Sequence, residues 1–599
     1  MSVSNVLLSE LSPQHPFVPM NYHFRALKIF RQSVSCLLLF LVCTAASVAQ
    51  ERTMGLMLNM PKAFEGYTLF APLRSTTTYL VDMEGRLVHS WPGKTTPGQL
   101  SYLLEDGRLI RCEMLHNLSF RGGGGGGRII TRSWEGDVLW EFIYSNNHVQ
   151  QHHDIEVLPN GNVLMIAWER KSRAEALAAG VDPQRVPDYG LFPDHIVEVR
   201  PEGADSGIIV WEWHLWDHLI QDVDSTKANY GVVEEHPELI NLNAQLTATD
   251  TRQPDWWHSN AIDYNADLDQ ILISVRNYSE IWIIDHSTTT EEAAGHTGGR
   301  YGRGGDLLYR YGNVRAYHPH APTLRQLYVQ HDARWIEEGY PGAGNILIFS
   351  NGDQTMGSYS SVLEIAPPVD SSGHYRIGGN GVYGSETPVW NYTAPNPRDF
   401  FAVNISGASR LPNGNTLICN GPVGEFFEVT PAGETVWRYI NPVTHDGPLT
   451  QGEEIPGSEF SKDNLVFRCT RFDAGYAGLQ GRDLTSGDPI ELYPTGIGSG
   501  GNPSDADASM AAQPTLAPNY PNPFTVSTIM RFSLPREEAV RLEILDALGR
   551  CVSVLLDARM TVGSHALRWN PDPALPAGMY LLRMRAGTHQ VTRTMLLRR

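Results

Sequence analysis

Short stretches in which apolar and polar residues alternate recur along most of the chain, and tight-turn residues separate them. The clearest example is residues 411–439, LPNGNTLICNGPVGEFFEVTPAGETVWRY. This segment predicts two successive hairpins, because alternation with a period of two is typical of half-buried strands and the Pro-Asn-Gly and Ala-Gly breaks suit tight turns. With one more strand from residues 406–411, it predicts a four-stranded antiparallel unit that ends in an aromatic residue.

The same unit recurs along the chain. Complete copies are found in residues 100–142, 154–213, 260–311 and 331–392, and pieces of another in residues 67–72, 78–82, 86–91 and 465–472. Repeats of four short strands are typical of a β-propeller, in which each blade buries a face only against the next blade. Joining the three front strands to the back strand closes the ring and leaves no free sheet edge. We therefore predict an all-β protein in which residues 60–475 form a six-bladed β-propeller.

The rest of the chain divides into a leader, a linker and a small second domain. Within residues 1–50, basic residues precede a short apolar run and small residues, which predicts a secretory signal peptide; a membrane anchor is the alternative. Residues 494–513 are rich in Gly, Ser, Asp and Ala and predict a linker. Residues 516–599 predict a small immunoglobulin-like β-sandwich. Its strands are expected near residues 528–533, 540–545, 564–570 and 579–585.

Composition narrows the possible partners and compartment. The formal net charge of −20 over 599 residues argues against a general nucleic-acid-binding protein. Two of the six cysteines lie in the leader, and the other four are scattered without a C-x-x-C pattern. One disulfide would suit an exported protein, but the sequence does not assign a pairing.

The candidate chemistry lies in histidines that precede or begin predicted inner strands. These are His152 and His153, His258, and His331. Inner strands line the channel of a propeller and the segments that enter them gather at one mouth, so we expect these imidazoles to converge there, beside long loops such as residues 214–255. One histidine could act as nucleophile, a second as general acid, and others, with Asn260 and Arg276, could donate to negative charge. The alternative, in which each histidine is a hydrogen-bonded core residue, stays open.

The sequence supports metal or phosphate binding less strongly than it supports chemistry by these histidines. His152 and His153 are neighbours on a strand and are expected to point to opposite faces, so they would not share one ion. His318 and His320 can share a face but have no accompanying carboxylate or cysteine pattern. The six glycines of residues 122–127 lack the Lys-Ser/Thr of a phosphate loop and predict a flexible hairpin loop. We therefore predict no metal site and no cofactor.

Several stretches of residues 60–475 resemble the bacterial aryl-sulfate sulfotransferase family. They include HDIEVLPNGNVL (153–164), WHSNAIDYNADLDQILISVRNYSEIWIID (257–285), and QHD (330–332) with the Asn-Gly pair at 351–352. The resemblance implies a propeller that moves a sulfuryl group from a phenolic sulfate ester to a phenol, without a nucleotide donor and through a sulfated histidine. It implies that His258 and His331 bind and polarise the sulfate. With His153, they are our predicted catalytic residues, and the predicted substrate-binding residues are Asn260, Arg276, Asn351 and His152.

The chain departs from this family in two places. The family's arginine beyond the Asn-Gly pair should fall in residues 353–357, which read DQTMG, and its transfer histidine should fall in residues 403–410, which read VNISGASR. His153 or His331 would then be the nucleophile, or the reaction is changed or lost. Two alternatives stay open: a non-catalytic surface propeller that binds glycans, sulfated ligands or protein partners, and a quinone-cofactor dehydrogenase, for which we find no calcium ligand set.

The C-terminal region carries a second resemblance. NYPNPF (519–524), LEILDALGRCV (542–552) and LPAGMY (575–580) resemble the C-terminal sorting domain of type IX secretion cargo. The resemblance implies that residues 516–599 engage the type IX secretion machinery. The protein would then be secreted, or attached to the cell surface through the outer membrane of a Gram-negative bacterium. The sequence does not predict the oligomeric state.

Overall fold

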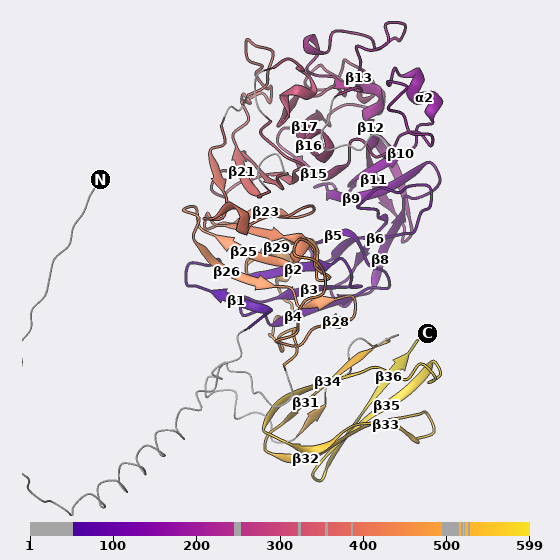
Figure 1. Ribbon diagram of the computed structural model, residues 1–599, viewed down its shortest axis with the longest axis vertical. Coiled ribbons are helices and arrows are strands. Elements are labelled where there is room, and N and C mark those ends of the chain that lie inside the picture. Colours follow the sequence, from indigo (N-terminus) through magenta and orange to yellow (C-terminus); the bar gives the residue numbers. More distant parts are fainter. Residues whose placement is uncertain are drawn as a thin grey trace, which may run out of the picture. The chain divides into compact units, whose positions relative to one another are not determined.

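The computed structural model describes residues 52–244, 253–321, 325–353, 358–384, 387–493, 514–516, 519, 522–524 and 527–598. The predicted signal peptide and linker lie outside the described residues, as do residues 354–357 of the DQTMG segment. Almost every strand pairing in the described part is antiparallel, and the few helices are short (Figure 1). None of the helices described is long and apolar enough to cross a membrane.

Residues 52–493 form six sheets of four or five strands. One has the order β29 (Val466–Phe472), β2 (Tyr67–Pro72), β3 (Thr77–Val81), β4 (Leu87–Pro92). Two follow chain order as β5 (Pro97–Leu103), β6 (Leu109–Met114), β7 (Gly127–Arg132), β8 (Val138–Ile143), and β9 (Val149–Val157), β10 (Val163–Glu169), β11 (Asp194–Glu202), β12 (Ser206–His214). Two more are β15 (Ser259–Asn265), β16 (Gln270–Val275), β17 (Glu280–Asp285), β18 (Tyr309–Tyr311), and β19 (His331–Trp335), β20 (Ile346–Ser350), β21 (Ser361–Ile365), β22 (Trp390–Tyr392). The last is β23 (Gly407–Arg410), β24 (Thr416–Asn420), β25 (Glu425–Val429), β26 (Thr435–Ile440), with β1 (Gly55–Asn59) outside β26.

The strand pairing confirms the four-stranded units predicted from the alternating pattern. Residues 407–440 fold as successive antiparallel strands β23 to β26. The front and back of this region also join as predicted, because β2 pairs with β29 from Tyr67↔Phe472 to Pro72↔Val466. Strand β1, which pairs with β26, was not predicted.

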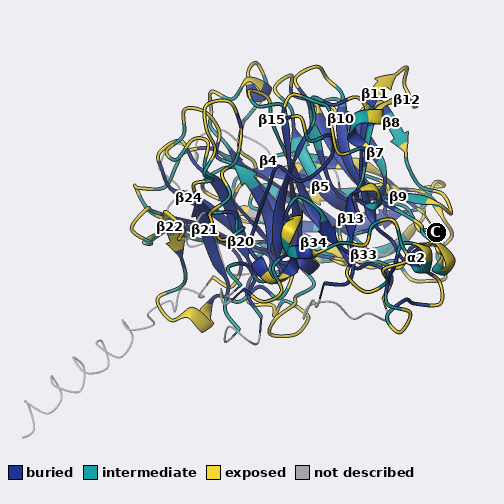
Figure 2. Ribbon diagram, turned by 90° about the horizontal axis from the view of Figure 1, so that it is seen from above, coloured by how far each residue is buried: buried dark blue, intermediate teal, exposed yellow. Residues whose placement is uncertain are grey.

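The inner strands of the six sheets surround one centre. Each contacts the inner strand of the next sheet in the cyclic order β29, β5, β9, β15, β19, β23 and back to β29. Figure 2 shows that these sheets are largely buried while the connecting segments are exposed. Residues that begin these inner strands are therefore brought together even when they are far apart in the sequence.

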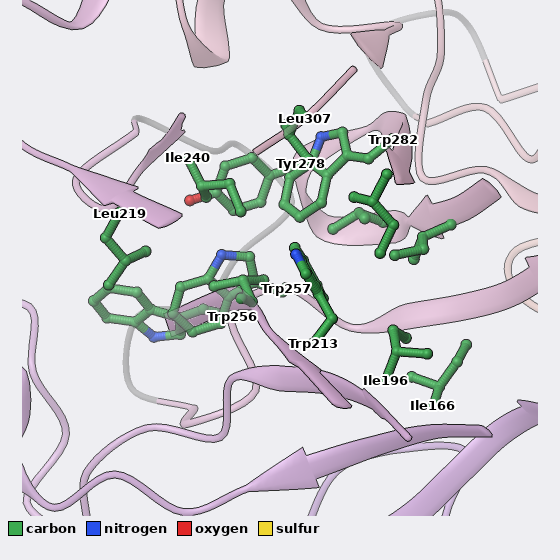
Figure 3. Packing of buried hydrophobic residues seen from close by; sticks show 14 of the residues in the cluster. Ile166, Ile196, Trp213, Leu219, Ile240, Trp256, Trp257, Tyr278, Trp282 and Leu307 are labelled. Atoms are coloured by element: carbon green, nitrogen blue, oxygen red, sulfur yellow. The ribbon is translucent and has the colours of Figure 1, made fainter. Parts of the chain in front are cut away.

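Aromatic side chains fill the space between neighbouring sheets. The largest cluster joins the sheet of β9–β12 to the sheet of β15–β18, and Figure 3 shows Trp213, Trp257 and Trp282 within it. All three are fully buried, and the indole nitrogen of Trp213 donates to the Gly305 carbonyl at 2.7 Å. Since Trp257 directly precedes His258, this packing holds the start of β15 in place.

The C-terminal region forms two further antiparallel sheets. Their strands are β30 (Thr515–Leu516), β31 (Thr528–Leu534) and β34 (Gly563–Trp569), and β33 (Cys551–Met560), β32 (Glu538–Leu545), β35 (Gly578–Ala586) and β36 (His589–Leu597). The four predicted strands are found as β31, β32, β34 and β35, while β33 and β36 were not predicted. Residues of both sheets share one apolar core.

His286 links two neighbouring sheets through two carboxylates, which predicts a pH-dependent stability. Its Nδ1 lies 2.7 Å from Asp269 Oδ1 and its Nε2 lies 2.9 Å from Glu198 Oε2. Burial lowers the pKa of His286, but the two carboxylates outweigh it and raise the pKa to about 9. Because the folded pKa lies above the unfolded value, the stabilisation is fully present below the unfolded pKa and is lost as pH rises through about 9.

We expect His286→Gln to lower the free energy of unfolding by about 1–3 kcal/mol near pH 6 and by much less near pH 10. The measurement is denaturant unfolding of both proteins at each pH. A difference that stays constant with pH would show that the charged form of His286 is not what stabilises the fold.

Candidate active site

Two of the predicted histidines are positioned by an irregular inner strand. His153 has a left-handed backbone with φ 52°, and the pairing of β9 with β10 shifts register between Met165 and Ala167. This bulge interrupts the alternation of side chains, so His152 and His153 do not point to opposite faces as we predicted. Instead their Nδ1 atoms lie 2.7 Å apart.

The hydrogen bonds of His152 determine which nitrogens carry protons. Its Nε2 lies 3.1 Å from Asp194 Oδ1, and the other oxygen of Asp194 accepts from the Ser259 amide at 2.8 Å. Since the Asp194 carboxylate only accepts, His152 Nε2 carries a hydrogen and its Nδ1 accepts one from His153 Nδ1. His153 Nε2 is then left with a lone pair. Burial, with His258 and His152 nearby, holds the pKa of His153 well below its usual value, so the ring is neutral.

His258 is paired with a carboxylate from the same segment. Its Nδ1 lies 2.5 Å from Asp255 Oδ2, and Asp255 Oδ1 accepts from the Trp168 indole at 3.2 Å. Burial opposes ionisation of Asp255, but His258 and these hydrogen bonds outweigh it and lower the pKa of the carboxyl. Asp255 therefore fixes the His258 ring with Nδ1–H toward the carboxylate, so that Nε2 lies on the side of the ring away from Asp255.

His331 is held by an amide instead. The side-chain nitrogen of Asn351 donates to the carbonyls of Ala402 and Ile405, at 3.0 and 2.9 Å. The side-chain oxygen Oδ1 of Asn351 is therefore the atom that lies 2.6 Å from His331 Nδ1 and accepts from it. His331 Nδ1 therefore carries the hydrogen, and Nε2 carries a lone pair. Burial, then the positive charge of Arg276, holds the pKa of His331 well below its usual value. The result is a neutral imidazole with an unprotonated Nε2.

The catalytic histidines predicted from the sequence gather in one place. The rings of His153 and His258 are 4.6 Å apart between centroids. Phe467 of β29 contacts both His153 and His331, with ring centroids 5.9 and 6.1 Å away. The pKa values of His153 and His331 also respond to the charges of neighbouring site residues: His331 acts on His153, and His258 acts on both.

A pocket of about 290 Å³ lies beside His258. Three segments line it, and their residues are Arg121, Gly122 and Gly123, then Gln253, Pro254 and Asp255, then Arg276 and Asn277. Arg276 Nη1 donates to Asn277 Oδ1 at 2.8 Å, and Asn277 in turn donates to the Asp255 carbonyl at 3.1 Å. A guanidinium is thus fixed at the wall of a pocket that also carries the carboxylate partner of His258.

The glycine run of residues 122–127 forms the part of the site that packs against the histidines. It joins β6 to β7 of a hairpin, as predicted, and the Gly124 carbonyl accepts from the His153 amide at 2.8 Å. A Cβ added at Gly124 would lie 2.0 Å from His153 Nε2, and one at Gly122 would lie 2.4 Å from the Trp168 ring. These glycines are required because the backbone passes directly over the imidazole and indole rings.

Comparison with known families gives two matches. The family model described as Arylsulfotransferase (ASST) matches residues 74–448, which is more than half of the chain. The chain belongs to the arylsulfotransferase family. A second model, described as Secretion system C-terminal sorting domain, matches residues 519–598. The protein is therefore an exported arylsulfotransferase-family protein that carries a type IX sorting domain, consistent with secretion and attachment at the surface of a Gram-negative cell.

More distant likenesses are weak. A protein of unknown function from Bacteroides caccae is 12% identical, with TM-score 0.35, over 68% of this chain and 99% of that chain. Hydrazine synthase from Kuenenia stuttgartiensis is 11% identical, with TM-score 0.29, over 49% and 67%. Virginiamycin B lyase from Staphylococcus aureus is 10% identical, with TM-score 0.30, over 66% and 86%. At such TM-scores these likenesses carry no weight for fold or function, and no curated protein matches the chain.

The remaining predicted residues of the candidate site in this arylsulfotransferase-family protein differ in how deeply they are buried. Arg276 lies at the pocket as the first residue of η3 (Arg276–Tyr278), directly after β16. Asn260 is fully buried and donates to the Gln330 carbonyl at 2.8 Å, which places it behind His331. His152 is fully buried behind His153, and Asn351 contacts His331. Sequence reasoning missed Asp255 and Asp194, although Asp255 stands three residues before His258 in the printed sequence.

The close packing of the glycine run leads to a testable expectation for this arylsulfotransferase-family protein. Gly124 has φ 79°, so alanine there would carry left-handed strain of about 1–2 kcal/mol as well as the collision with His153. We expect Gly124→Ala to lower any sulfuryl-transfer rate by about 10²-fold or more, because small displacements of catalytic groups are costly.

Gly136→Ala is the matched control. Gly136 also has a left-handed backbone, with φ 95°, but nothing lies within 4 Å of an added Cβ. This variant should lose about 1–2 kcal/mol of stability and keep its activity. Equal activity losses in the two variants would mean that the contact with His153 is unimportant.

Proposed function

We propose that the protein is an exported aryl-sulfate sulfotransferase that moves a sulfuryl group from a phenolic sulfate ester to a phenol. We also propose that the six sheets of residues 52–493 are the blades of one propeller and that the sorting region is an immunoglobulin-like sandwich. Family membership supports the reaction class. The observation that carries the mechanism is the neutral His331, whose Nε2 lone pair is left available by the Asn351 hydrogen bond.

In the first half-reaction, His331 Nε2 attacks the sulfur of the donor. A nitrogen–sulfur bond forms as the bond between sulfur and the phenolic oxygen breaks, and the leaving phenolate takes a proton from His258 Nε2. The step needs His258 in its protonated form, and the Asp255 carboxylate lies 2.5 Å from His258 Nδ1 to face that charge. In the second half-reaction, His258 removes the proton of the acceptor phenol, whose oxygen attacks the sulfur and releases His331.

The non-bridging oxygens of the sulfuryl group need positive or polar partners throughout. Arg276 supplies a fixed guanidinium at the pocket, and Arg121 is a second cation on its wall. The backbone amides of Gly122 and Gly123 line the same pocket and donate to no acceptor within the described part of the chain. Together these groups suit an anionic ligand, because backbone amides and guanidinium groups stabilise charge without reorganising.

The test is to incubate the purified protein with a chromogenic aryl sulfate, with and without an added phenol. We expect release of the phenolate that depends on the acceptor phenol, and a covalent adduct with the mass of SO₃ on His331 when the acceptor is withheld. Absence of turnover over a broad panel of donors would reject the proposal.

A non-catalytic binding protein is the second candidate. It is favoured by the two departures from the family pattern, at residues 353–357 and 403–410. This function would be selected if the protein bound a sulfated ligand without turning it over. Its affinity for that ligand should then stay unchanged when His153, His258 and His331 are each replaced by alanine.

A further inference from the structure

A second histidine cluster lies apart from the candidate active site. His218 ends η1 (Leu215–His218), which follows β12, while His296 and Asp306 lie in the segment between α3 (Thr290–Ala293) and β18. Asp306 Oδ1 is 2.9 Å from His218 Nδ1 and 2.8 Å from His296 Nδ1. The three residues each offer one possible ligand atom, and these three atoms all lie within 4.8 Å of one another. The cluster thus connects the segment after β12, the last strand of one sheet, to the segment before β18, the last strand of the next sheet.

The hydrogen bonding of His218 leaves a place for a cation. Its Nε2 lies 2.9 Å from the Ala293 carbonyl, which can only accept, so Nε2 carries the hydrogen. In the neutral ring Nδ1 then has a lone pair, and that lone pair faces a carboxylate oxygen of Asp306. His218 is fully buried, and the Asp306 side chain is 8% exposed. Two electron-pair donors facing each other in a buried place require a positive ion, either a proton or a metal, between them.

Several features favour a metal over a proton. Two imidazoles and a carboxylate are typical ligands of Zn²⁺, and tetrahedral bonds of about 2.0–2.1 Å would separate them by about 3.3 Å, close to the present spacing. The bond from His218 Nε2–H to a carbonyl is the support that metal-binding histidines usually have. The His296 side chain is 60% exposed, which gives an ion a path from solvent and leaves a position for water.

The surroundings hold His218 in this orientation without the ion. Its ring stacks on Trp213, with centroids 5.5 Å apart and planes 4° from parallel. A Cβ at Gly305 would lie 2.6 Å from His218 Nε2 and 2.0 Å from the Ala293 carbonyl oxygen, so only glycine fits there. His218 is thus held in place by its surroundings, whereas the His296 side chain is 60% exposed.

We propose that His218, His296 and Asp306 bind one divalent transition-metal ion of the zinc class, which ties the segment after β12 to the segment before β18. This site is independent of the sulfuryl-transfer proposal. His218 is far from His296 and Asp306 in the sequence, and the three ligands form no spaced motif, so the sequence predicted no metal site.

The test uses the full-length protein, freed of metal with a chelator and then titrated with Co²⁺ and Zn²⁺. We expect one equivalent of Co²⁺ to bind saturably with the visible absorption bands of a tetrahedral site. We expect Zn²⁺ to displace it and to raise the unfolding temperature.

His296→Ala should abolish both the absorption bands and the thermal shift, and it should keep the fold because the side chain is exposed. His236→Ala is the control, since His236 is also half-exposed and its Nδ1 lies 2.9 Å from the Glu238 carboxylate. Absence of saturable Co²⁺ binding, or binding that survives His296→Ala, would overturn the proposal.

Discussion

His331→Ala should lower the rate of sulfuryl transfer by at least about 10³-fold, because it removes the nucleophile that the proposed mechanism needs. The loss should appear in kcat, measured with an aryl sulfate donor and a phenol acceptor, and the covalent adduct should disappear with it. The neutral state of His331 adds a pH expectation. Burial and Arg276 hold its pKa well below the usual value, so the nucleophile should stay unprotonated, and the release of phenolate in the first half-reaction should persist, as pH falls below the range in which free histidine titrates.

Two controls separate the loss of a nucleophile from the loss of a fold. Imidazole added to His331→Ala should restore part of the turnover, since it can occupy the vacated space and accept the sulfuryl group. His445→Ala replaces an exposed histidine that is paired with Asp463 and should leave the rate unchanged. Full activity in His331→Ala together with loss of activity in His153→Ala would assign the nucleophile to His153.

Alternation of apolar and polar residues predicted most of the strand architecture. It predicted the unit found as β23–β26 and the pairing of β2 with β29, because each four-stranded sheet repeats the same period-two pattern between turn residues. Strand β1 was not predicted because its five residues stand alone and pair with β26, which is far away in the sequence. Pairing partners of a single isolated strand are not encoded in its own pattern.

The candidate site could be predicted in part. The positions of His153, His258 and His331 at inner-strand starts were enough to predict that they meet. The left-handed backbone of His153 could not be predicted, since positive φ is uncommon outside glycine and is imposed here by the bulge in β9. The proton positions also depend on distant partners such as Asp194, which only the folded chain brings to His152.

Arg468→Met should cost about 3–5 kcal/mol in the free energy of unfolding, because it removes the cation of a buried ion-pair network. Arg468 lies on β29, the strand that pairs with β2 and so joins the two ends of the six-sheet region, and its side chain is only 4% exposed. Its Nη1 lies 2.8 Å from Asp154 Oδ2, its Nε lies 2.9 Å from Asp332 Oδ1, and its Nη2 donates to the Asn260 carbonyl at 3.0 Å. One side chain thus links β29 to β9, β15 and β19.

The cost arises mainly from the carboxylates left behind. Asp332 keeps a second cation, Arg334, at 2.8 Å, whereas within the described residues Asp154 forms an ion pair with Arg468 alone. Adding Asp154→Asn to Arg468→Met should therefore recover part of the lost stability, and denaturant unfolding of the two single variants and the double variant measures this coupling. Arg438→Met is the control: its partner is Glu425 and its side chain is 46% exposed, so it should cost less than about 1 kcal/mol. Equal losses in Arg468→Met and Arg438→Met would show that closure of the ring does not depend on the buried network, and that apolar packing around β29 holds the ends together.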